Sequence, residues 1–159
     1  SKKLAEAINA QINAELWSAY LYLSMAQYAH HKGFVGAGKW FTKQFAEEQE
    51  HAAKFIDYLH EHHEKVILQP IASVPTEWNS VLEAFQATLD HEMKVTKLIH
   101  GLAELAAAEN DLATQNFLAW FIDEQVEEEH HAFIIVKKLQ YFEGDKVGLY
   151  TIDKELGSR

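Results

Sequence analysis

The stretch Glu47-Glu48-Gln49-Glu50-His51 decides the fold, because it places charge on a face that the rest of its helix keeps apolar. The surrounding residues 39–55 have a helical pattern, in which apolar side chains recur in alternating steps of four and three. This stripe contains Phe41, Phe45, Ala52, Phe55 and Leu59, and Glu48 falls in the middle of it. His51 lies one turn after Glu48 on the same side. A carboxylate and an imidazole on a buried face need compensation, which a metal ion can provide.

The composition predicts a single helical domain over residues 1–159. Of the 159 residues, 48% are apolar and 24% charged, and only two are proline and seven glycine. The chain has no cysteine, which excludes disulfides and thiolate metal sites and fits a cytoplasmic location. We find no apolar run long enough to cross a membrane. The net charge of −10 argues against nucleic acid as a partner and favours cations.

The apolar pattern predicts four long helices and a short fifth one that packs at one end of the others. We expect these helices at about residues 2–31, 37–64, 78–109, 111–142 and 148–156. A glycine-rich turn around residues 33–38 would separate the first two helices. Ser80 to Glu83 has the form of a capping box, and Asp111 is suited to cap the fourth helix.

Residues 66–79 contain both prolines and no helical pattern. Fourteen extended residues reach about 45 Å, and a helix of 28 residues is about 42 Å long. The segment is therefore long enough to run the full length of a bundle and to leave the second and third helices parallel. The expected fold is an all-α four-helix bundle with a long crossover between its second and third helices.

Each long helix carries one glutamate in its apolar stripe: Glu15, Glu48, Glu92 and Glu128. Glu92 lies 18 residues before Asn110 and Glu128 lies 18 residues after it, so the two would be level in an antiparallel pair. Glu15 and Glu48 would be level to within about a turn or two. Whether the two pairs are level with each other depends on the crossover, and the sequence leaves this open.

Four buried carboxylates at one depth would repel one another and take up protons unless cations neutralise them. With His51 they form a ligand set that suits iron or manganese better than structural zinc. Five ligands for two metals imply bridging carboxylates and open positions, which oxygen chemistry needs. Gln125 precedes Glu128 by one turn. Tyr22 lies two turns after Glu15, although a tyrosine there is also an ordinary core residue.

Two other motifs compete with this set of residues. Glu127 and His130 form a second Glu-x-x-His, but residue 127 points about 100° away from residue 128 and lies off the apolar stripe. We therefore rank Glu127 below Glu128. The run of histidines and glutamates over residues 60–64 lies at a helix C-terminus, where histidines are usually solvated, so we expect a solvated surface there.

The chain resembles the non-haem bacterial ferritins over essentially its whole length. The resemblance is carried by residues 13–16, 47–51, 55–59, 91–92, 116–121, 123–129 and 149–156. It implies a cage of 24 subunits with a ferroxidase centre in each. There, Fe(II) would be oxidised by O2 or peroxide, and ferric oxide-hydroxide would be stored inside the cage.

The resemblance also implies roles by motif position. The first iron would be held by Glu15, Glu48 and His51, and the second by Glu48, Glu92 and Glu128. Glu48 would then bridge the two ions, Gln125 would lie beside the second, and Tyr22 would be a nearby redox-capable side chain.

A third iron site of bacterial ferritins is matched by Glu47, Glu124, Glu127 and Glu128. Bacterioferritins are similar, but they carry a histidine in place of Glu128. They also carry a haem-binding methionine where this chain has Gln49. We therefore expect no haem.

Two other functions deserve comparison. A discrete di-iron oxidase or peroxidase of the same bundle class would share the site but would form no storage cage. A metal-free structural or signalling bundle can also use long crossovers, but it has no reason to place one glutamate per helix on the inner stripe. Particle size and iron capacity would separate these possibilities.

Overall fold

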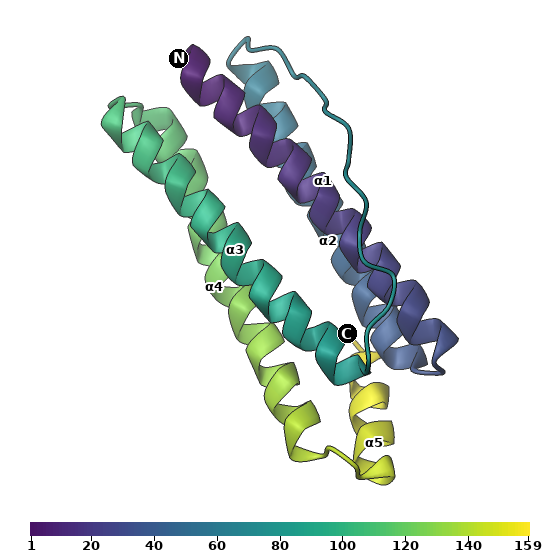
Figure 1. The fold of residues 1–159 in the computed structure, drawn as a ribbon. Coiled ribbons are helices and arrows are strands. Elements are labelled where there is room, and N and C mark those ends of the chain that lie inside the picture. Colours follow the sequence, from purple (N-terminus) through teal and green to yellow (C-terminus); the bar gives the residue numbers. More distant parts are fainter.

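The computed structural model describes residues 1–159, which form five helices (Figure 1). The helices are α1 (Lys2–His31), α2 (Val35–Glu61), α3 (Val81–Ala108), α4 (Leu112–Tyr141) and α5 (Lys146–Leu156). Two antiparallel hairpins, α1–α2 and α3–α4, lie side by side, and α5 packs against α2 and α4 at one end. The predicted bundle with a long crossover and a short fifth helix is confirmed. No helix combines the length and apolarity that a membrane crossing requires.

Residues in the left-handed backbone conformation end the first three helices. Gly33, His63 and Asn110 have φ angles of 86°, 59° and 55°. After α2, the backbone N–H groups of His63 and Glu64 donate to carbonyls of the last helical turn, which is the Schellman pattern. For this reason α2 ends at Glu61, whereas the sequence pattern extends it to residue 64.

Side-chain caps start the third and fourth helices. The Ser80 hydroxyl accepts from the Glu83 backbone N–H at 3.1 Å, and Asp111 caps α4 in the same way through Thr114. The Glu83 carboxylate accepts from Asn79 N–H at 2.7 Å, one residue earlier than in a standard capping box. Consequently α3 begins at Val81 and not at residue 78.

The crossover, residues 62–80, runs alongside α1 from one end of the bundle to the other (Figure 1). Three side chains of α1 hydrogen-bond to the backbone of the crossover. They are spaced seven or eight residues apart and therefore lie on one face of α1. Asn9 binds Lys65 and Ile67, Trp17 binds Ser73, and Ser24 binds Pro75. Because the crossover spans the bundle, α2 and α3 run in the same direction, as its length predicts.

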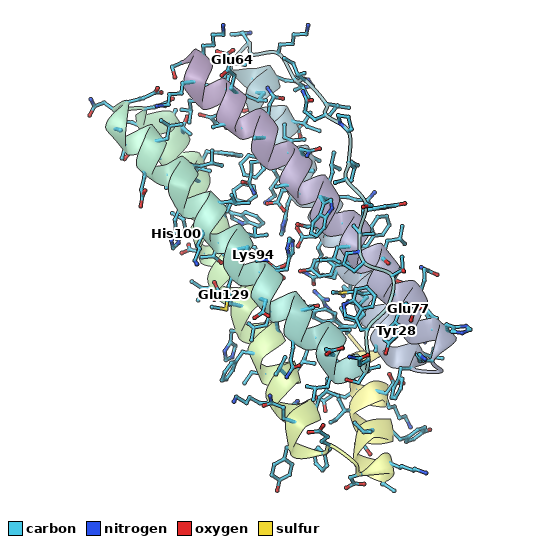
Figure 2. All side chains as sticks on the ribbon, in the orientation of Figure 1. Tyr28, Glu64, Glu77, Lys94, His100 and Glu129 are labelled. Atoms are coloured by element: carbon cyan, nitrogen blue, oxygen red, sulfur yellow. The ribbon has the colours of Figure 1, made fainter.

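The core consists of two apolar clusters with a polar layer between them along the bundle. In the cluster near α5, the rings of Phe41 and Phe85 stack with centroids 4.6 Å apart. In the cluster near the start of α1, Phe55 and Phe121 stack at 4.2 Å. Side chains from both hairpins fill the space between the ribbons (Figure 2). The polar layer contains Glu15, Ser18, Gln44, Glu48, His51, Glu92, Gln125 and Glu128.

Candidate metal centre

The four glutamates of the inner stripes meet in the middle of the bundle, one from each long helix. Glu15, Glu48 and Glu92 are 1–2% exposed, and Glu128 is 6% exposed. The two hairpins are therefore level with each other at this point. The apolar clusters on either side fix the positions of the helices. These clusters contain none of the candidate metal ligands, so apolar packing alone determines where the four carboxylates lie.

Three overlapping groups of side chains could hold a cation, because the ligand atoms of each group lie within 4.8 Å of one another. The first group is Glu15, Glu48 and His51, and the second is Glu48, Glu92 and Glu128. Glu48 belongs to both, so its carboxylate can bridge two cations. The third group is His51, Glu124 and Glu128.

His51 belongs to both the first and the third group, and aromatic side chains pack against it. Its Nδ1 atom is 3.4 Å from Glu48 Oε2 and 3.9 Å from Glu15 Oε2. The imidazole packs edge-on against Trp120 and Phe121, with ring centroids 5.5 Å and 6.0 Å away. Glu15 Oε2 is buried without any hydrogen-bond partner. Leaving a buried carboxyl oxygen without a partner is costly, and a cation between these residues would satisfy it. The donor set thus fits a divalent cation.

Two glutamines that sequence reasoning missed also belong to the centre. Gln11 Nε2 donates to Glu15 Oε1 at 3.0 Å. Gln44 Nε2 donates to Glu128 Oε2 at 2.6 Å and to Glu48 Oε1 at 3.3 Å. The available signal was a repeated Gln-x-x-x-Glu motif, which puts a glutamine one turn before the stripe glutamate in both α1 and α2.

Glu92 is held by Tyr22 and Gln125. The Tyr22 hydroxyl donates to Glu92 Oε1 at 2.5 Å, and Gln125 Nε2 donates to Glu92 Oε2 at 3.1 Å. Gln125 also lies 3.2 Å from the Thr96 hydroxyl. With the two glutamines of α1 and α2, these donors give every one of the four carboxylates a neutral hydrogen-bond partner.

Burial raises the pKa of all four carboxyl groups. Charges on neighbouring carboxylates add to this effect, so the pKa values of Glu15 and Glu48 lie well above the ordinary glutamate value. Burial raises the pKa of Glu92 to about 7 and that of Glu128 to about 8. Burial and the Glu92 charge also raise the pKa of Tyr22. A cation that binds here must therefore displace protons.

The residues that match a third iron site are not gathered in one place. Glu124 and Glu128 share the third group with His51. Glu47 instead accepts from Arg159 Nη2 at 2.7 Å, and Glu127 is exposed and in none of the three groups.

Comparisons with known proteins give one consistent result. The family model of the ferritin-like domain matches residues 5–141. The bacterial non-heme ferritin of Bacteroides fragilis is 46% identical over 159 residues, covering all of this chain and 99% of that protein. The one from Staphylococcus epidermidis is 38% identical, covering all of this chain and 96% of the relative. A crystal structure of an open pore ferritin from the archaeon Archaeoglobus fulgidus superimposes with a TM-score of 0.99. The two sequences are 48% identical, and the match covers all of this chain and 98% of the archaeal chain.

Proposed function

This chain belongs to the ferritin family of iron-storage proteins, and we propose that it oxidises Fe(II) with O2 at the buried four-glutamate centre. The observation that carries the proposal is the pair of ligand groups that share Glu48. Two Fe(II) ions bound side by side can together supply two electrons to one O2 molecule. The ferric product would then move to a mineral store.

We assign the first Fe(II) to Glu15, Glu48 and His51, and the second to Glu48, Glu92 and Glu128. Hard, anionic carboxylates stabilise Fe(III) relative to Fe(II) and so favour the oxidation. In this proposal Tyr22 and Gln125 position Glu92, and Tyr22 is also an oxidisable side chain next to the second ion. The support is the short contact of Tyr22 with Glu92 and the overlap of the two ligand groups.

A third iron position is supported only around Glu124. This residue shares a ligand group with Glu128 and His51, whereas Glu47 is bound to Arg159. For Glu47 and Glu127 to act as ligands, their side chains would have to turn toward Glu124. We therefore propose that a third iron binds after the first two, because it alone requires Glu47 to give up its ion pair with Arg159.

We further propose that 24 chains form a hollow cage in the cytoplasm, without haem. The support is the full-length similarity to ferritins and the number of large apolar side chains left exposed on a single chain. Tyr141, Leu112 and Val147 are 83%, 77% and 76% exposed. Side chains of this kind are expected to be covered by neighbouring subunits. The absence of cysteine fits a reducing compartment.

The proposal is tested by measuring the iron retained per chain across a size-exclusion peak after aerobic loading with Fe(II). We expect tens of irons per chain, eluting with a particle of about 440 kDa (24 chains of 18.2 kDa). About two irons per chain on a small oligomer would instead indicate a discrete di-iron oxidase. No retained iron would contradict the metal centre itself.

A further inference from the structure

Gln44 is the one neutral side chain that connects two of the carboxylates across helices. It lies on α2, one turn before Glu48, and is 1% exposed. Its Nε2 atom is 2.6 Å from Glu128 Oε2 on α4 and 3.3 Å from Glu48 Oε1 on its own helix. Glu48 and Glu128 are two of the three members of the second ligand group.

The other two glutamines of the centre behave differently. Gln11 donates to the single carboxylate of Glu15, and Gln125 donates to the single carboxylate of Glu92. Neither links two members of one ligand group. Gln44 alone puts N–H groups between two carboxylates that would have to contact the same cation.

The orientation of the Gln44 amide is set by these carboxylates. If the amide were turned over, its N–H groups would no longer face Glu128 Oε2 and Glu48 Oε1, and both contacts would be lost. In the observed orientation Oε1 is buried and has no hydrogen-bond partner. An unpartnered buried acceptor is unfavourable, so the donation to Glu128 and Glu48 must outweigh it.

We propose that Gln44 is a positioning residue that stands in for the second cation, holding Glu48 and Glu128 together when no cation is bound and releasing them when one binds. This inference rests on the proposed binding of two cations. Because the second cation must displace the amide from both carboxylates, Gln44 weakens the second binding step. The first step is spared, because Gln44 contacts Oε1 of Glu48, whereas His51 of the first group faces the other oxygen, Oε2. The two cations then bind in order, the first to Glu15, Glu48 and His51.

The test uses the assembled protein and Co(II), which O2 does not oxidise in this setting, with calorimetry and visible absorbance as readouts. The parent should bind two Co(II) ions per chain in two distinguishable steps. Gln44→Leu retains the side-chain bulk and removes the donor. The second step should then become about tenfold tighter, because the hydrogen bonds of the Gln44 amide no longer compete with the cation.

The matched control is Gln11→Leu, which removes an amide from the first ligand group. It should change the first step and leave the second as in the parent. If Gln44→Leu does not fold, Gln44→Asn serves as the second variant. Its amide is one methylene shorter and cannot reach Glu128, so the same selective tightening is expected.

Tightening of the second step alone supports the role of Gln44, because a merely structural defect would affect both steps. An unchanged or weaker second step, or an equal change in both steps, overturns it. A parent that binds only one Co(II), or none, contradicts the proposed di-iron centre, and the inference then falls with it. A parent that binds two ions while Gln44→Leu behaves identically contradicts the inference alone.

Discussion

Glu48 is the residue on which the centre depends most, since the first two ligand groups share it. Glu48→Gln preserves the side-chain shape but removes the bridging charge. We expect Fe(II) oxidation to slow by at least about 10- to 100-fold, the range seen when residues that only support ligands are changed. Stopped-flow absorbance of the ferric product measures this rate.

The matched control for this variant is Glu127→Gln. Glu127 lies one residue from Glu128, but it is exposed and belongs to none of the ligand groups. The control should oxidise the first two Fe(II) ions per chain at the parental rate. Equal rates for Glu48→Gln and the parent would show that the ligand assignment is wrong.

The raised pKa values of Glu92 and Glu128 predict how stability depends on pH when no metal is present. The folded chain holds protons on these groups up to about pH 7 and pH 8, whereas the unfolded chain releases them near pH 4.5. Folding is therefore favoured at low pH, and this stability is lost as pH rises through the folded pKa values. Between pH 6.5 and 9 we expect these two groups together to cost about 3 kcal/mol.

Urea unfolding in the presence of a chelator measures this loss, with Glu128→Gln as the control. The neutral amide cannot titrate, so the variant should lose less stability over the same pH range. His91, whose pKa burial lowers to about 4, stays neutral in the folded chain throughout this range. Parental stability that rises from pH 6.5 to 9 would contradict the raised carboxyl pKa values.

At the level of helices, α5 provides the N-terminal cap that α2 lacks. The N-cap residue of α2, Phe34, provides no side-chain hydrogen bond. Instead, the Asp153 carboxylate of α5 accepts from the backbone N–H groups of Gly36 and Ala37 at 3.0 Å and 2.8 Å. A Cβ atom on Gly36 would lie only 1.6 Å from the Asp153 carbonyl oxygen. A glycine at this position is therefore needed for α5 to approach α2.

Asp153→Ala should lower the free energy of unfolding by about 1 kcal/mol, as removal of an N-cap usually does. Thermal or urea unfolding measures the change. Asp145→Ala is a useful control, because Asp145 caps its own helix through Gly148 and makes no bond to α2. Increased hydrogen exchange at the start of α2 should appear only in Asp153→Ala. An unchanged exchange rate there would contradict capping by α5.

The crossover is held to α1 most directly by Asn9. Its side chain donates to Lys65 O at 2.9 Å and accepts from Ile67 N–H at 2.8 Å. Asn9→Ala should therefore speed hydrogen exchange of the Ile67 amide markedly while leaving the helices protected. Ser24→Ala, which loosens only the contact to Pro75, should leave Ile67 exchange unchanged. Parental exchange at Ile67 in Asn9→Ala would show that the crossover is held by other contacts.

At the scale of the whole molecule, the exposed face of the crossover predicts an interface. Leu68 is 66% exposed and Ile71 45% exposed, although both are large aliphatic residues. Replacing both by serine should break the proposed cage into smaller species without loss of helix content, since neither side chain is in the core. Light scattering after size exclusion measures the particle mass.

The matched control for that pair is Lys65→Ser together with Gln69→Ser, which changes exposed polar side chains of the same segment. The control should retain the parental mass. If the Leu68 and Ile71 variant also retained it, the assembly would depend on other surfaces, such as those around Tyr141 and Val147.

The bundle, its crossover and its stripe glutamates could be predicted because they follow from local periodicity. Spacing along a helix determines which side chains share a face, and so Leu118, Phe121, Gln125 and Glu128 are all buried as the fourth stripe predicts. The prediction was less accurate where neighbouring helices decide burial. On α2 the inward residue is Gln44 rather than Phe45, which is only partly buried.

By itself the sequence determined the helix order, the direction of α3 and most of the residues that face the interior, because these depend on spacing and chain length. Only the tertiary structure decided that the two hairpins are level, that Gln44 bridges Glu48 and Glu128, and that Arg159 binds Glu47. These contacts join residues far apart in the chain. Their distances depend on how the apolar clusters set the offset between helices, and side-chain periodicity carries no information about that offset.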